Sequence, residues 1–239
     1  MKHALILLAL ALPLAAEDWP QFLGPRRDGS YHGKPLPRWP IAGPAVVWKM
    51  DIGAGFAGPS VDDGRLFLFH RIKDKEMLDC MDANTGKINW RRSTVADYKD
   101  QFGFDEGPRA VPTVSAERVF TLGANGLIQC ADVRSGKTLW VVDAKKQFRA
   151  DQGFFGFACS PMVNGANLLI NISGNNAGII ALDINSGKLR WSVAKEKASC
   201  ASPILAVIND TPRAIFFTRD GVVVTDPLKG TVQFTHPWR

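Results

Sequence analysis

Residues 181–191 read ALDINSGKLRW, and this stretch decides the fold. The pattern occurs three more times without gaps, at residues 80–90 (CMDANTGKINW), 130–140 (CADVRSGKTLW) and 224–234 (VTDPLKGTVQF). Each copy has an aspartate, a glycine four residues later and a large ring eight residues after the aspartate: Asp82, Gly86 and Trp90; Asp132, Gly136 and Trp140; Asp183, Gly187 and Trp191; Asp226, Gly230 and Phe234. The rings recur at intervals of 50, 51 and 43 residues. This period is typical of β-propeller blades and solenoids.

The residue types of the unit suit a tight turn followed by a strand. An aspartate side chain accepts hydrogen bonds from backbone amides just ahead of it, and glycine supplies a residue with positive φ. Each unit follows a run rich in β-branched and aromatic residues, at 65–71, 118–124, 167–174 and 213–220. Before each run comes a short segment containing proline, at 57–62, 111–115, 159–164 and 201–206. Proline is tolerated where a strand begins, so each repeat predicts a four-stranded antiparallel meander.

The repeats predict an all-β fold, a β-propeller of four-stranded antiparallel blades. About four blades are expected, at residues 53–92, 108–143, 157–194 and 199–235, within a repeat region that spans 46–239. Residues 17–45 are expected to form an irregular, proline-rich segment. No stretch after residue 16 shows the apolar period of a helix.

The first 16 residues have the features of a secretory signal peptide. Lys2 and His3 precede an unbroken apolar run at residues 4–12, and small residues follow at positions 15 and 16. The run is too short to span a bilayer, and no later run approaches the required length. No cysteine follows the leader, so a lipid anchor is not indicated. We therefore expect a periplasmic or secreted protein without a transmembrane segment.

The repeat resembles that of a known family. Residues 181–191 match AxDxx[ST]GKxxW, the tryptophan-docking motif of the pyrroloquinoline-quinone (PQQ) repeat, while 224–234 is a degenerate copy. The stretch DWPQFLGPRRDG at 18–29 looks like the opening of exported PQQ-like propellers related to BamB. The resemblance implies that each ring packs against the neighbouring blade, and that seven or eight blades close the ring. The chain is then part of a larger ring, or two copies assemble. Residues 45–48 (AVVW) resemble the outer strand of a blade that lacks its other strands.

Two loops longer than hairpin turns, at 97–109 and 149–157, lead into expected innermost strands and are candidates for a ligand funnel. The candidate residues are Asp105, Glu106, Arg109, Phe155 and Ser160, with further phenylalanines of both loops as apolar walls. Of the two interpretations we favour the structural one, in which Arg109 pairs with a neighbouring carboxylate and the phenylalanines plug the channel.

The four cysteines predict no metal site. Cys80 and Cys130 occupy the small-residue position of the repeat, so we expect buried free thiols. Cys159 and Cys200 begin innermost strands of consecutive blades, and the sequence leaves open whether they form a disulfide. The chain has no CxxC pair and no histidine-rich spacing, which argues against zinc.

Composition and motifs favour binding over catalysis. The net charge of +6 is spread along the chain without a basic cluster, so a nucleic-acid partner is not expected. The chain has no adjacent cysteine pair, which PQQ-dependent dehydrogenases often carry, and no evident Ser/His/Asp set. The resemblance therefore implies a non-catalytic, BamB-like scaffold for binding or assembly, whose partner is another protein or a second copy. The alternative is a quinoprotein oxidoreductase of alcohols or sugars that uses PQQ with calcium.

Overall fold

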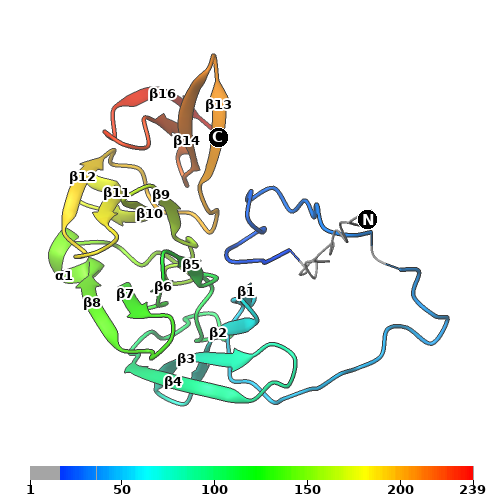
Figure 1. Cartoon of the computed structure of the whole chain (residues 1–239). Coiled ribbons are helices and arrows are strands. Elements are labelled where there is room, and N and C mark those ends of the chain that lie inside the picture. Colours follow the sequence, from blue (N-terminus) through cyan, green and yellow to red (C-terminus); the bar gives the residue numbers. More distant parts are fainter. Residues whose placement is uncertain (1–16, 36, 239) are drawn as a thin grey trace, which may run out of the picture.

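The structure, a computed structural model, describes residues 17–35 and 37–238. The expected signal peptide at residues 1–16 lies outside the described residues. Four sheets, each of four antiparallel strands in sequence order, follow one another around an arc (Figure 1). The all-β propeller predicted from the repeat is confirmed.

We number the four sheets as blades in chain order. Blade 1 contains β1 (Ser60–Asp62), β2 (Arg65–Ile72), β3 (Lys75–Asp82) and β4 (Ile88–Val95). Blade 2 contains β5 (Thr113–Ser115), β6 (Arg118–Leu122), β7 (Leu127–Asp132) and β8 (Thr138–Asp143). Blade 3 contains β9 (Met162–Asn164), β10 (Asn167–Gly174), β11 (Ala177–Asp183) and β12 (Leu189–Val193). Blade 4 contains β13 (Ile204–Ile208), β14 (Thr211–Phe217), β15 (Gly221–Thr225) and β16 (Val232–Pro237). A short helix that the sequence did not indicate, α1 (Ala144–Phe148), follows β8.

The repeated aspartate and glycine form the turn before the outer strand of every blade. In blade 1, Asp82 Oδ1 accepts hydrogen bonds from the amides of Asn84 and Thr85, at 3.1 and 2.8 Å. The Gly86 amide donates to the Asp82 carbonyl at 2.9 Å, and Gly86 has a φ of 71°. The other three blades repeat this arrangement. Because a side chain is strained at this φ, glycine is favoured here.

The tryptophan that ends one blade lies over the turn glycine of the next. Trp140 Nε1 donates to the Ile184 carbonyl of blade 3 at 3.0 Å. A Cβ added to Gly187 would lie 2.8 Å from the Trp140 ring, so no side chain fits beneath it. Trp90 makes the same contacts with Val133 and Gly136, and Trp191 lies over the glycine of blade 4. Three hydrophobic clusters fill the spaces between successive blades.

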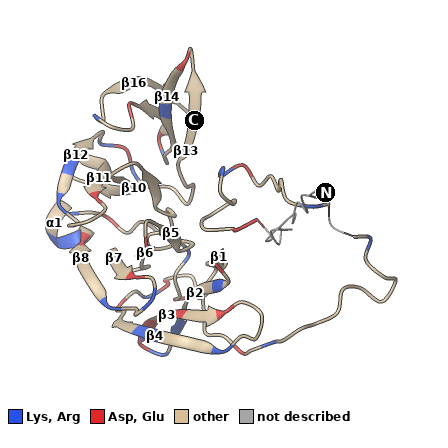
Figure 2. Ribbon diagram, in the orientation of Figure 1, with Lys and Arg blue, Asp and Glu red and all other residues tan. Residues whose placement is uncertain are grey.

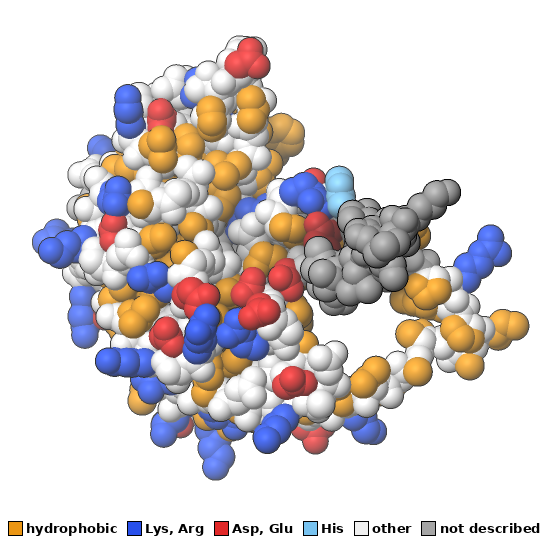
Figure 3. Space-filling view, viewed as in Figure 1, with side chains coloured by type: hydrophobic (Ala, Val, Ile, Leu, Met, Phe, Trp, Pro, Cys, Tyr) orange, Lys and Arg blue, Asp and Glu red, His pale blue; other side chains and the backbone are white. Residues whose placement is uncertain are grey.

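The two ends of the arc differ. Trp48, which precedes blade 1, lies over Gly86 and donates to the Ala83 carbonyl at 3.0 Å, as the other tryptophans do to their neighbouring blades. Residues 45–48, which resemble an outer strand, belong to no sheet in the structure. At the other end, Phe234 is 54% exposed. Hydrophobic side chains gather on blade 4 (Figure 3), including Val207, Phe217 and Trp238. Completion of the ring by further blades or by a second copy stays a prediction.

The N-terminal segment lies on the concave side of the arc (Figure 1). Trp19 pairs with Val61 of β1, and the Pro20 carbonyl accepts from the Val114 amide of β5. Arg27, only 5% exposed, donates to the carbonyl of Pro203 at 2.7 Å, and also to those of Ser160 and Pro161. Residues 18–27 therefore contact the inner side of all four blades.

Candidate functional site

Five exposed phenylalanines lie on the segments that lead into blades 1, 2 and 3. They come from the segment before β1, the loop between β4 and β5, and the loop between α1 and β9, and we call them the aromatic rim: Phe56, Phe102, Phe104, Phe154 and Phe155. The Phe102 ring centroid lies 5.8 Å from that of Phe154 and 5.9 Å from that of Phe155. Exposed apolar clusters of this kind mark interaction surfaces.

A buried arginine holds the first rim loop in place. Arg71 of β2 donates to the carbonyls of Tyr98, Glu106 and Ala96 at 2.8, 2.9 and 3.1 Å. Asp100 accepts from the amides of three loop residues further along the chain. These hydrogen bonds fix the backbone, so the loop presents its phenylalanines from a rigid frame.

The acidic candidates of this loop act mainly on the loop itself. Asp105 accepts from the Gly55 amide at 3.1 Å and from the Gly107 amide at 2.6 Å. Glu106 lies 3.4 Å from both Arg71 and Lys99. Their oxygens therefore anchor the loop, and they tie it to the segment before blade 1.

Arg109 is held without a carboxylate. Its guanidinium donates to the carbonyls of Gly107 and Asp105, at 3.0 and 2.8 Å. The guanidinium carbon lies 5.3 Å from the ring centroid of Tyr98 and 5.6 Å from that of Phe56. Across the described residues, no carboxylate lies within ion-pair distance of Arg109. Asp105, Glu106 and Arg109 thus lie in one loop, and Arg109 lines a hollow together with Phe155.

Ser160 lies apart from this group. It is buried, its Oγ accepts from the Val111 amide at 2.9 Å, and its own amide donates to Ser202 Oγ at 2.9 Å. Ser160 therefore joins the inner sides of blades 2, 3 and 4 and does not line the space below the rim.

Three of the rim phenylalanines border a hollow of about 390 Å³, lined by Phe56, Phe104, Arg109, Phe155, Ala158 and Cys200. Its walls are mostly apolar, and Arg109 is its one charged side chain. Sequence reasoning missed Phe56 and Cys200, because they lie outside the two long loops. Their positions depend on how the blades bring distant connections together, which no local pattern shows.

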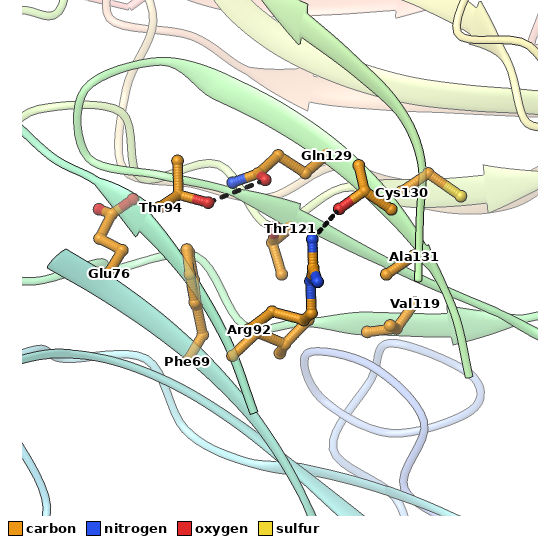
Figure 4. Close-up of a pocket in the computed structure, with 11 residues that line it drawn as sticks. Phe69, Glu76, Arg92, Thr94, Val119, Thr121, Gln129, Cys130 and Ala131 are labelled. Carbon is orange, nitrogen blue, oxygen red and sulfur yellow. Dashed lines mark hydrogen bonds between the residues drawn. The ribbon is translucent and has the colours of Figure 1, made fainter. Parts of the chain in front are cut away.

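A second, smaller cavity of about 20 Å³ lies between blades 1 and 2 (Figure 4). Glu76, 1% exposed, accepts from the Ala124 amide at 2.8 Å through Oε1, whereas Oε2 has no hydrogen-bond partner among the described residues. Burial raises the pKa of Glu76 to about 7. The cavity has room for about one water molecule, so it is no ligand site.

A buried histidine–aspartate pair in blade 1 is also structural. His70 Nε2 lies 3.0 Å from Asp79 Oδ2, and His70 Nδ1 accepts from the Gly53 amide at 2.7 Å. Although burial opposes it, hydrogen bonds from Arg91 and His70 hold the pKa of Asp79 below its usual value. Both members of the pair are buried, so a substrate has no access to them.

All four cysteines are free thiols, and only Cys200 is exposed. Burial raises the pKa of Cys130 to about 12 and that of Cys159 to about 11. The described part of the chain contains no group of three or more His, Cys, Asp or Glu side chains that could hold a metal ion. It also contains no helix long and apolar enough to cross a membrane.

Comparison with known proteins gives one family and several similar folds. A family model described as outer membrane protein assembly factor BamB matches residues 42–147 and 74–237. The serine/threonine-protein kinase AfsK of Streptomyces griseus is 24% identical over 177 residues, which are 72% of this chain and 20% of the kinase.

Two solved structures share the fold. BamB from Moraxella catarrhalis is 19% identical with a TM-score of 0.51, and the match covers 77% of this chain and 52% of that one. Quinohemoprotein alcohol dehydrogenase from Comamonas testosteroni is 15% identical with a TM-score of 0.60, covering 94% of this chain and 42% of the enzyme. The chain thus spans about half of the structural relatives or less, and at these identities the likeness shows the fold alone.

Proposed function

The chain belongs to the family described as outer membrane protein assembly factor BamB, and from this premise we propose that it is an exported, non-catalytic propeller that binds a protein partner as an assembly scaffold. The observation that carries the proposal is the aromatic rim, which exposes five phenylalanines, two of them on a loop whose backbone is held by Arg71 and Asp100. Rigid, exposed aromatic side chains are typical anchors of protein interfaces.

The charges near the rim support binding over catalysis. A general acid or base needs a titratable group within reach of the substrate, but Asp105 and Glu106 are engaged in holding the loop. Lys and Arg are scattered over all four blades (Figure 2). Such a distribution is unlike the basic face of a nucleic-acid-binding protein.

The side chains present do not fit the alternative, a quinone bound with calcium. Calcium takes six to eight oxygen ligands, and the described residues contain no group of three or more His, Cys, Asp or Glu side chains that could hold a metal ion. On the concave side of the arc, the carbonyls of Ser160, Pro161 and Pro203 already accept hydrogen bonds from Arg27. We therefore derive no redox step for this chain.

Two measurements test the proposal. Purified protein is titrated with PQQ and calcium, and dye-linked oxidation of alcohols and sugars is assayed. We expect neither saturable binding nor turnover, and turnover would reject the non-catalytic function.

Photo-crosslinking then tests for a protein partner. A photo-crosslinking amino acid at position 104, inside the rim, is compared with one at position 234, on the exposed face of blade 4. We expect covalent adducts with one protein from position 104 that are reduced by Phe155→Ser. Mass spectrometry of the adduct shows whether that protein is a second copy. Equal adducts from both positions would argue against a specific site at the rim.

A further inference from the structure

The hollow below the aromatic rim continues into two others and forms a groove. A hollow of about 210 Å³ shares Phe155 and Cys200 with the first hollow, and it shares Phe154 and Arg219 with a third hollow of about 450 Å³. The groove therefore runs from the loop that precedes blade 2 to the loop between β14 and β15 of blade 4. An extended chain can follow the three connected hollows.

The groove changes character along its length. Its first end, beside Phe56, Phe104 and Phe155, is mostly apolar. Its other end is lined by polar and charged side chains, among them Lys197 and Arg219. A ligand that fills it needs a large apolar group at one end and polar groups at the other.

The charged side chains of the groove indicate the sign of the charge that a ligand would carry. Arg219 lies over the Phe154 ring at 4.5 Å. Among the described residues, three cations line the hollows, Arg109, Lys197 and Arg219, against one carboxylate, that of Asp151, which accepts from the Gly153 amide at 3.1 Å. The nearby Asp220 carboxylate accepts from the Lys197 amide at 2.7 Å. An excess of cations in the lining favours an anionic ligand.

We propose that the groove binds an extended acidic peptide segment of the protein partner, an inference that rests on the proposed binding function. A large apolar side chain of the peptide enters the first hollow among Phe56, Phe104 and Phe155. Carboxylates further along the peptide face Arg219 and Lys197. The phenylalanines and arginines of the groove suit such a peptide, because both side-chain types bury apolar area and arginine adds charge-assisted hydrogen bonds to carboxylates.

Cys200 offers a direct readout in the native protein, because it lines the groove and is the exposed thiol while the other three cysteines are buried. The rate of Cys200 modification by a thiol reagent is measured with the peptide acetyl-GDFDEG-amide, with acetyl-GKFKKG-amide and with acetyl-GDGDEG-amide. We expect the first peptide to slow modification at least about tenfold at saturation, and the other two to have little effect. A Cys200→Ser variant gives the background rate.

Variants of exposed residues then locate the peptide. We expect Phe104→Ser and Arg219→Gln each to weaken binding of the acidic peptide about tenfold, the effect of losing a central contact. Both side chains are exposed, so the fold is retained. The matched controls Phe234→Ser and Arg134→Gln, in exposed positions away from the groove, should bind normally.

Each other outcome rejects the inference. Equal protection by the acidic and basic peptides would show that charge does not select the ligand. If neither peptide protects Cys200 while a protein still crosslinks at position 104, the acidic-peptide inference fails and the binding function stands. Protection by PQQ alone, together with dye-linked turnover, would reject both.

Discussion

Trp140 tests the central idea that aromatic rings join the blades. The side chain is 9% exposed, and its Nε1 donates to the Ile184 carbonyl of blade 3. A buried tryptophan removes roughly 150–250 Å² from water, worth about 4–6 kcal/mol at about 25 cal/mol per Å². Measured losses for Trp→Ala in protein cores are about 3–5 kcal/mol. We therefore expect Trp140→Ala to lower the free energy of unfolding by about 4 kcal/mol.

The assay is urea unfolding followed by far-UV circular dichroism. Phe234→Ala is the matched control, because Phe234 holds the same position in the repeat but is 54% exposed. We expect this control to change the free energy of unfolding by less than about 1 kcal/mol, in line with an exposed site. The reasoning is refuted if Trp140→Ala is as stable as the wild type, or if the two variants lose the same amount.

Three further predictions concern buried and exposed polar groups. The pKa of about 7 for Glu76 means that the folded state keeps a proton that the unfolded state loses near pH 4.5, so stability falls as pH rises from about 4.5 to 7. Glu76→Gln should remove about 3 kcal/mol of that dependence, as measured by urea unfolding at both pH values. Arg27→Met should lower the melting temperature, because three backbone carbonyls lose their hydrogen-bond donor. An unchanged melting temperature would show that these hydrogen bonds do not stabilise the fold. A thiol reagent should modify one cysteine, Cys200, in the folded protein and all four in urea, as counted by mass spectrometry.

The sequence was most informative where structure repeats. The spacing of Asp183, Gly187 and Trp191 is set by one turn and one strand, so the sheets and their order followed from it. The fourth repeat was recognisable despite its phenylalanine, because its aspartate and glycine still make the turn.

Long-range contacts of irregular segments were not visible in the sequence. Trp48 lies over Gly86 without belonging to a strand, and Arg27 is buried although arginine is almost always exposed. For the same reason, the sequence predicted only part of the candidate site. The loops of the rim were recognised by length, but the contributions of Phe56, Cys200 and Arg219 depend on the arrangement of the blades in space.

The position of the N-terminal segment has a consequence for how the chain folds during synthesis. Arg27 is separated from its acceptor on Pro203 by 176 residues. The ribosome adds Arg27 long before Pro203, and the N-terminal segment cannot complete these contacts until blade 4 has been synthesised. Contacts over such long sequence separations are slow to form. The oldest part of the nascent chain is therefore among the last to reach its final position.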